Sequence, residues 1–193
     1  MAQTPRELKF LALGDSYTIG ESVAEKDRWP VQLAAQLRAK GLNVGDPKII
    51  ATTGWRTDDL KNAIVKDNPS TDYDYVSLLI GVNNQYQGKS SAAYAPEFEE
   101  LLKMAIEFAG GDRSKVFVVS IPDYGFTPFG KEKKETITKA IDEFNAVNKS
   151  ITENTRSNIS TSRQSPVRVL MIRSWWRLMG CIHPGRCMGN GSR

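Results

Sequence analysis

Three short segments of this 193-residue chain place hydroxyl, glycine and amide groups directly after apolar runs. Gly14-Asp15-Ser16 follows "LKFLAL", Gly54 follows "PKIIATT", and Asn83 follows "YDYVSLLIGV". Acyl transfer needs a nucleophilic hydroxyl together with several hydrogen-bond donors aimed at the oxyanion that develops. Ser16 could supply the nucleophile and one backbone N–H. The Gly54 N–H and the Asn83 side-chain amide could supply the other donors.

Each of these residues also has a purely structural interpretation. Asp15 or Ser16 could cap a helix after a strand, Gly54 could serve a turn, and Asn83 could tolerate a left-handed loop conformation. The segment "GDSYTIG" matches neither the dinucleotide-binding fingerprint nor the phosphate-binding P-loop. It also lacks the G-x-S-x-G elbow of the common α/β-hydrolases. The chemical interpretation therefore depends on the three segments lying together.

The elements that must position these groups alternate between strand and helix over the first 153 residues. Short apolar runs predict strands at 8–14, 47–54, 73–84 and 114–125. Helical spacing with start and stop signals predicts helices at 29–41, 56–67, 96–111 and 134–152. Such repeated units indicate an α/β fold with a parallel sheet and helices on both faces. Ligands of open parallel sheets bind beyond the carboxyl ends of the strands, so the three segments should meet at one edge.

The charge of the chain is divided unevenly. Residues 154–193 hold seven Arg, no Lys and no acidic residue, which leaves 19 basic and 22 acidic residues in 1–153. The formal charge of +4 is therefore a property of the last 40 residues, and a uniformly basic nucleic-acid-binding face is not supported. Those residues also hold His183, Cys181 and Cys187, too few ligands for a typical zinc site.

Taken together, the three segments resemble the blocks of the SGNH hydrolases, the GDSL-type esterases and lipases. The matching residues are Gly14-Asp15-Ser16, Gly54 and Gly81-Val82-Asn83-Asn84, with Asn84 standing where the pattern usually has Asp. The resemblance covers roughly residues 8–153. It implies a flavodoxin-like α/β/α sandwich, with Ser16 as nucleophile and with Ser16 N–H, Gly54 N–H and Asn83 as the oxyanion hole. It also implies ester substrates (small molecules, lipids or sugars) and no cofactor or metal.

The fourth block of that family, D-x-x-H, supplies the base and its orienting Asp, and this block is imperfect here. His183 is followed by Pro184 as expected, but Gly180 stands where the Asp should be. His183 is therefore either a base that works without its Asp or a histidine without a catalytic role. Loss of a triad carboxylate can cost on the order of 10⁴ in turnover, so weak activity is expected of the printed chain.

A displaced reading frame after about residue 153 would explain this ending. If one base was lost in an A-rich run near Glu153, restoring it permits codons for residues 154–193 to encode a strand-like segment followed by D-G-L-H. In the printed chain the restored His codon would straddle Cys181 and Ile182, and His183 would match only by accident. On this hypothesis the final strand and helix of the fold are disrupted.

The sequence thus predicts one α/β domain over residues 1–153 and an anomalous, poorly ordered basic segment over 154–193. The predicted function is hydrolysis of carboxylic esters through an acyl-enzyme on Ser16. The alternative is a non-catalytic flavodoxin-like module that binds a small molecule. No apolar run approaches the roughly 20 residues needed to span a bilayer, and no secretory leader is visible. A cytoplasmic protein, or an exported one whose leader is absent here, is expected.

Overall fold

The computed structural model describes residues 6–155 and 168–170, and they form one parallel sheet covered by helices. The strand order is β2-β1-β3-β4-β5, with every neighbouring pair parallel. The strands are β1 (Phe10–Gly14), β2 (Lys48–Ala51), β3 (Tyr75–Leu79), β4 (Val116–Val119) and β5 (Arg168–Leu170). The predicted α/β class with a parallel sheet is therefore confirmed.

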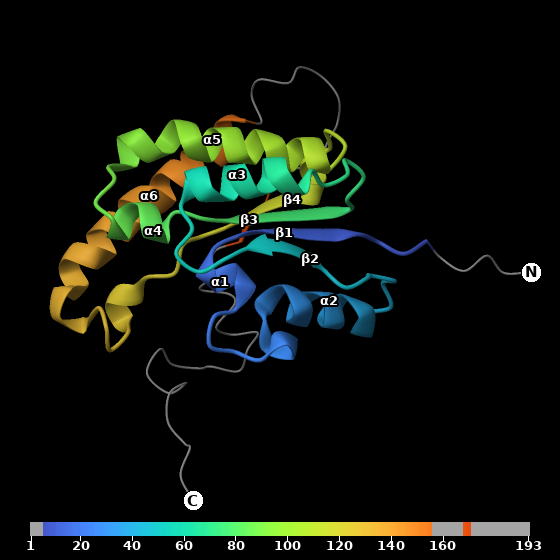
Figure 1. Cartoon of the computed structure of the whole chain (residues 1–193), viewed down its shortest axis with the longest axis horizontal. Coiled ribbons are helices and arrows are strands. Elements are labelled where there is room, and N and C mark those ends of the chain that lie inside the picture. The colour runs from blue at the N-terminus through green and yellow to red at the C-terminus, as the bar shows by residue number, and fades with distance from the viewer. Residues whose placement is uncertain (1–5, 156–167, 171–193) are drawn as a thin grey trace, which may run out of the picture.

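Helices lie on both faces of this sheet, as right-handed crossovers between parallel strands require. One face carries α3 (Thr57–Asp67), α5 (Ser91–Phe108) and α6 (Lys134–Asn154), and α5 packs against both α3 and α6. The other carries α1 (Ser16–Ile19) and α2 (Trp29–Ala39), seen below the sheet in Figure 1. The short helix α4 (Val82–Tyr86) follows β3 directly.

The apolar spacing of the helices accounts for the core. The larger buried cluster joins strand residues to the inner faces of α3, α5 and α6, including Ile137, Ile141 and Phe144 of α6. Val147 and Ile151, which continue the same helical spacing, pack against this cluster while partly exposed. A smaller cluster lies under α2 and contains Phe10, Ala12, Ala34 and Val44.

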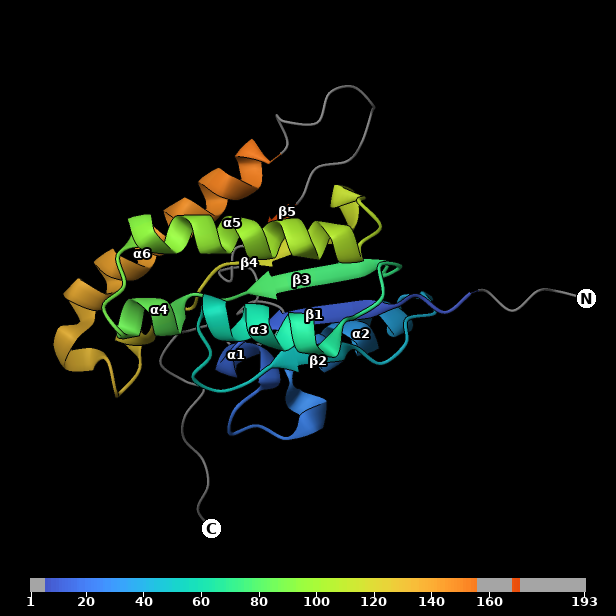
Figure 2. The ribbon, with the colours of Figure 1, turned by 45° about the horizontal axis from the view of Figure 1, so that its top comes forward.

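The register of the strands brings their carboxyl ends to one edge. Gly14, the last residue of β1, is paired with Ala51 at the end of β2 and with Leu79 at the end of β3. The arrowheads of β1 and β3 point to the same end of the molecule in Figure 2, where α1 and α4 lie. The sequence-based expectation that the three segments follow strands at a shared edge is therefore confirmed.

Several predicted boundaries differ from the structure; the strand predicted at 114–125, for example, ends at Val119. Two of the differences have a clear physical reason. The strand predicted at 73–84 ends at Leu79, because Gly81 adopts a φ of +128° and the next residues form α4 instead. The helix predicted to start at Pro96 begins earlier, at Ser91, with the Ser90 hydroxyl accepting from Ala93 N–H. Pro96 lies inside α5, where it removes only one backbone hydrogen bond from a long helix with a buried face.

Residues Arg168–Leu170 form a short parallel strand at the edge of the sheet, paired with β4 through Phe117, Val118 and Val119. With three residues it is shorter than the other four strands, and the predicted disruption of the final strand stays a prediction. The predicted loss of a final helix concerns residues 171–193, which lie outside the described residues.

Candidate active site

Ser16 stands at the first position of α1, immediately after the end of β1. Asp15 precedes it as the N-cap, and its carboxylate accepts a hydrogen bond from Tyr17 N–H at 3.0 Å. Thr18 and the Leu79 carbonyl lie so close to the position that a Cβ would take at Gly14 that no side chain fits there. Within the described residues the Ser16 N–H has no hydrogen-bond partner. The turn therefore presents the Ser16 hydroxyl and one open N–H at the sheet edge.

Asp15 is almost fully buried, and burial raises its pKa from 3.8 to about 7 despite the hydrogen bond from Tyr17 N–H. The neighbouring Tyr17 phenol is also largely buried, and this burial, together with the Asp15 charge, raises the pKa of Tyr17 to about 12. Asp15 thus caps α1 directly before Ser16, in line with its interpretation as a helix-capping residue.

Gly54 follows β2 in an exposed loop and has a φ of +82°. This is the left-handed region, which a glycine enters without steric cost. No atom lies within 4 Å of the position that a Cβ would take, and the Gly54 N–H has no partner within the described residues. The loop therefore offers a second open backbone donor near the carboxyl end of β2. Helix α1, which carries Ser16, packs against that strand.

Asn83 lies in the first turn of α4, and its side chain is tied to the Gly54 loop. Its Nδ2 donates a hydrogen bond to the Trp55 carbonyl at 2.9 Å. An amide nitrogen carries two protons, so this bond fixes the plane of the amide and leaves one proton for another acceptor. The structure therefore joins two of the three predicted site segments directly.

Asn84, noted in the sequence only as a departure from Asp, forms a second link between the same loops. It is fully buried, accepts from Thr57 N–H at 3.2 Å, and donates to Thr57 Oγ1 at 2.7 Å. The Thr57 hydroxyl in turn donates to Glu97 of α5. In the helix predicted at 56–67, a Thr next to the start suggests a cap, because Thr is a favoured N-cap residue. That interpretation is wrong, because Arg56 occupies the N-cap position and the Thr57 side chain serves this buried contact instead.

Three aromatic side chains, from α4 and from the segment after β4, contact one another. The rings of Tyr86, Tyr124 and Phe129 contact one another with centroids 6.0 to 6.3 Å apart, and Tyr86 and Phe129 are exposed. We call these three residues the aromatic cluster. The Tyr124 hydroxyl donates to Gln85 Oε1 on α4 at 2.9 Å, and the Tyr124 phenol lies close enough to raise the pKa of Tyr17. The cluster is therefore held to α4, the helix that carries Asn83.

Asp123, in the Pro-Asp turn after β4, has a structural role. Its carboxylate accepts from Gly125 N–H at 2.8 Å and from the Thr138 hydroxyl at 2.6 Å. One carboxylate oxygen thus stabilises the loop itself, and the other holds it to α6.

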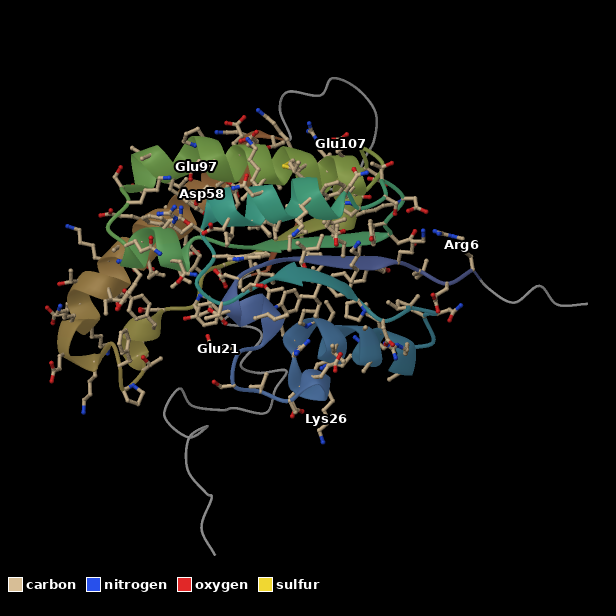
Figure 3. All side chains as sticks on the ribbon, viewed as in Figure 1. Arg6, Glu21, Lys26, Asp58, Glu97 and Glu107 are labelled. Carbon is tan, nitrogen blue, oxygen red and sulfur yellow. The ribbon has the colours of Figure 1, made fainter. Side chains whose placement is uncertain are left out.

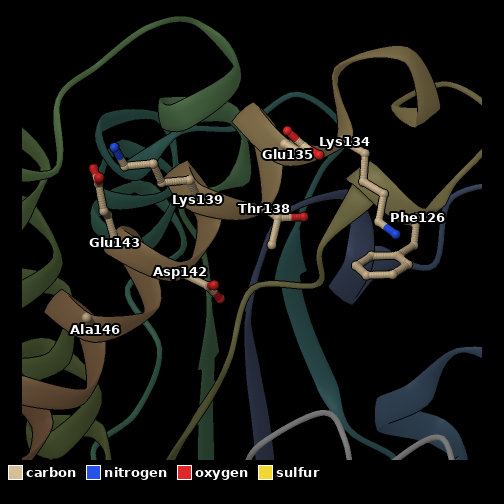
Figure 4. A pocket seen from close by; sticks show the side chains of 8 residues that line it. All are labelled: Phe126, Lys134, Glu135, Thr138, Lys139, Asp142, Glu143 and Ala146. Carbon is tan, nitrogen blue, oxygen red and sulfur yellow. The ribbon is translucent and has the colours of Figure 1, made fainter.

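An open groove of about 670 Å³ runs along α6 beside this loop (Figure 4). Charged side chains form most of its lining, with Phe126 at one end; the lining residues are Phe126, Lys134, Glu135, Thr138, Lys139, Asp142, Glu143 and Ala146. Neither Ser16, Gly54 nor Asn83 is among them, so this groove is distinct from the edge that carries the candidate chemistry.

The predicted base is not placed by the structure. His183, the only histidine of the chain, lies outside the described residues, as do Gly180, Cys181 and Cys187. The described residues consequently contain the nucleophile and the oxyanion donors of the predicted mechanism without its base. No helix among those described is both long and apolar enough to cross a membrane.

Solved structures with the same fold are numerous and distant in sequence. AlinE4, an SGNH-hydrolase family esterase, has a TM-score of 0.69 at 15% identity over 99% of this chain and 88% of its own. A lipolytic G-D-S-L family member from Veillonella parvula has 0.65 at 16% identity over 91% and 84%. TesA has 0.61 at 13% identity over 95% and 86%.

No curated protein matches the chain. The model of the GDSL-like lipase/acylhydrolase family, in contrast, matches residues 12–162, which include all three site segments and exclude His183. With its parallel sheet, its strand-end segments and a match over most of its length, the chain belongs to the GDSL-like lipase/acylhydrolase family of SGNH hydrolases, an esterase-type hydrolase family.

Proposed function

We propose that the chain is a serine hydrolase that cleaves carboxylic esters through an acyl-enzyme on Ser16. The observation that carries this proposal is the set of unengaged donors at one sheet edge. Within the described residues, the N–H groups of Ser16 and Gly54 have no partner, and Asn83 retains one amide proton beyond its bond to Trp55. Donors held in this way stabilise a tetrahedral oxyanion without having to reorganise during the reaction.

In this mechanism a base removes the Ser16 proton, and Ser16 Oγ attacks the ester carbonyl carbon. The carbonyl oxygen becomes an oxyanion held by Ser16 N–H, Gly54 N–H and the Asn83 amide. Collapse expels the alcohol, which takes the proton from the base, and water then hydrolyses the acyl-enzyme by the same steps. If His183 is the base, it lacks an orienting Asp and supports only slow turnover; with the displaced frame, the base is instead the histidine of the restored D-x-x-H.

The aromatic cluster supports an ester with a substantial apolar part. Tyr86 is three residues beyond Asn83, so an acyl or alcohol group leaving the oxyanion hole on that side meets exposed rings. Burying such a group against Tyr86 and Phe129 contributes roughly 25 cal/mol per Å² of apolar surface removed from water. Esters with longer apolar groups should therefore bind more tightly than acetate esters.

Labelling with a fluorophosphonate probe tests the proposed nucleophile. The full chain should form a covalent adduct, and Ser16→Ala should abolish it, because only a serine activated beside an oxyanion hole reacts readily with such probes. Ser22→Ala is the matched control, since Ser22 is an exposed serine six residues away, and it should leave labelling intact. A folded protein that forms no adduct, both as the printed chain and with the reading frame restored, contradicts the proposal and favours the non-catalytic binding module.

The domain division at residue 153 and the displaced reading frame are part of the same proposal. The family match ends at residue 162, so the segment with His183 lacks the support that the three site segments have. The coding DNA should show a short A-run near codon 153, with D-x-x-H encoded in the restored frame. A clean open frame that encodes the printed ending, together with an intact mass that agrees with it, contradicts the displaced frame.

A further inference from the structure

A chain of polar side chains connects the two loops that carry the proposed oxyanion donors. Asn84, at the centre of α4, makes two hydrogen bonds to Thr57 at the start of α3. Both residues are buried to 1% exposure or less. Thr57 continues the chain to Glu97 of α5, and Lys89 contacts the same carboxylate. Figure 3 shows Glu97 beside Asp58, in the first turn of α3.

The chemistry of each group sets the direction of every proton in this chain. The Thr57 backbone N–H can only donate, so the Asn84 oxygen must face it and the Asn84 amide nitrogen must face Thr57 Oγ1. Thr57 Oγ1 thus accepts from Asn84, and its single proton is directed to Glu97. Burial disfavours the charge on Glu97, but hydrogen bonds from Lys89 and Thr57 outweigh it and lower the pKa of Glu97.

We propose that Asn84, Thr57 and Glu97 form a proton-ordered positioning unit, which fixes the Gly54 loop relative to Asn83 and so sets the geometry of the oxyanion hole. This inference rests on the proposed function. Asn84 is adjacent to Asn83, and Thr57 is three residues after Gly54, so the unit spans the same two loops as the Asn83–Trp55 hydrogen bond. With both the Asn84–Thr57 and the Asn83–Trp55 hydrogen bonds in place, the two segments cannot rotate about a single contact.

The same order explains why Asn stands at position 84 where the family pattern has Asp. An Asp at this position would need the Thr57 proton for its own carboxylate, and Glu97 already uses that proton. Two carboxylates would then face one hydroxyl with a single proton between them. One carboxylate would have to bind a proton from solvent, or the contact would open.

The Asn84→Asp variant should therefore make the loop geometry dependent on pH. The like charge and the missing donor raise the pKa of the carboxylate pair in the folded protein above its unfolded value. Protonation at low pH restores the contact, and the contact is lost as the pH rises through the raised pKa. The charged and titratable groups that face Glu97 are Lys89, Arg56 and Asp58, with the Tyr94 phenol on α5.

Exchanging the amide of position 84 with the carboxylate of position 97 should remove the pH dependence of the loop geometry. In Asn84→Asp combined with Glu97→Gln, the amide introduced on α5 donates to Thr57 Oγ1, and Thr57 donates to the new carboxylate on α4. That carboxylate also accepts from Thr57 N–H at the start of α3, where the helix dipole favours negative charge. Glu97→Gln alone is the matched control, because its amide oxygen still accepts from Thr57 and the proton order is unchanged.

The experiment follows the Gly54 backbone amide and the Asn83 side-chain amide by ¹⁵N NMR in the full chain, between pH 5 and pH 8. In Asn84→Asp both signals should move away from their wild-type positions as the pH rises and return as it falls. The double variant and Glu97→Gln should keep wild-type positions at every pH. Unchanged signals in Asn84→Asp, or a double variant as perturbed as the single one, overturn the proposal.

Fluorophosphonate labelling separates this inference from the proposed function. If the unit positions the oxyanion hole, Asn84→Asp at pH 8 should slow labelling of Ser16 by roughly 10- to 100-fold, with recovery in the double variant. If the NMR signals of Asn84→Asp move as expected but Ser16 is labelled at the wild-type rate, the link between the unit and the oxyanion hole is contradicted. Absence of labelling in every variant, with the NMR pattern intact, refutes the serine hydrolase and leaves the positioning unit in place.

Discussion

Asn83 has two amide protons, and the Trp55 carbonyl accepts one of them. This single contact decides the orientation of the remaining proton, which the proposed mechanism assigns to the oxyanion. Asn83→Ala should therefore reduce the rate of Ser16 labelling by about 10²- to 10³-fold, the usual cost of one oxyanion donor. Thermal unfolding should change little because Asn83 is only partly buried. A labelling rate within twofold of wild type would remove Asn83 from the oxyanion hole.

Asp15 gives the site a dependence of stability on pH. Its pKa is raised from 3.8 to about 7 by burial, so the folded chain retains a proton that the unfolded chain releases between these values. The free energy of unfolding should accordingly fall as the pH rises through this window. A rise of the Asp15 pKa from 3.8 to about 7 corresponds to a loss of roughly 4 kcal/mol. Asp15→Asn keeps an oxygen for Tyr17 N–H and removes the titration.

Urea unfolding of Asp15→Asn and wild type at pH 4.5 and pH 8 measures this effect. The variant should gain stability relative to wild type at pH 8 and lose that advantage at pH 4.5. The Asp123→Asn variant serves as the control carboxylate, since Asp123 is a partly exposed acceptor in another turn. A difference between Asp15→Asn and wild type that does not change with pH would contradict the buried titration.

At the scale of elements, Tyr94 of α5 connects β3 to α6. Its buried hydroxyl lies 3.0 Å from the Ile80 carbonyl and 2.8 Å from Asn148 Oδ1, and a Cβ added at Gly81 would approach it to 2.8 Å. The tyrosine therefore packs beneath the turn that leads to Asn83. Removing its hydroxyl leaves buried polar groups without this partner, which typically costs about 1–3 kcal/mol.

Tyr94→Phe should lower the free energy of unfolding by that amount without changing the denaturant slope, as measured by urea unfolding. Phe98→Leu on the same helix provides a comparison in which packing, and no hydrogen bond, is altered. A neutral Tyr94→Phe variant would show that neither Ile80 nor Asn148 depends on this hydroxyl.

The sequence predicted these elements where local signals agree with the fold. Apolar runs and helix end signals predicted β1, α2, α3 and α6 to within a few residues. The strand at 73–84 was extended too far because "LLIGV" is apolar throughout, whereas the backbone turns at Gly81. The start of α5 was misplaced because Pro favours a helix start, whereas the Ser90 cap lies six residues earlier.

The site was predictable only in part. Ser16, Gly54 and Asn83 were singled out because each follows a strand, and the register places those strand ends together. No local pattern in the sequence indicated the contact between Thr57 and Glu97, since it joins residues 40 positions apart on two helices. Such a contact exists only after α3 and α5 have packed, so no spacing rule reveals it.

At the scale of the whole molecule, the described residues contain the proposed nucleophile and oxyanion donors, and the predicted base lies outside them. Restoring one nucleotide to the coding DNA near codon 153 should supply the D-x-x-H block with its catalytic histidine. The rate of ester hydrolysis should then rise by up to ~10⁴-fold over that of the printed chain. Hydrolysis of p-nitrophenyl esters measures this directly. In the restored chain, replacing the new histidine with Gln should return the rate to that of the printed chain. Equal rates for the restored and printed chains would contradict the displaced frame.

The central claim, that Ser16 is the nucleophile, is tested most directly by locating the fluorophosphonate adduct by mass spectrometry. Trypsin should release residues 10–26 as one peptide, which contains both Ser16 and Ser22. The account predicts one adduct per chain, on this peptide, with fragment ions that assign it to Ser16. An adduct on Ser22 or on another peptide, or no adduct on the folded chain even after the reading frame is restored, would contradict it.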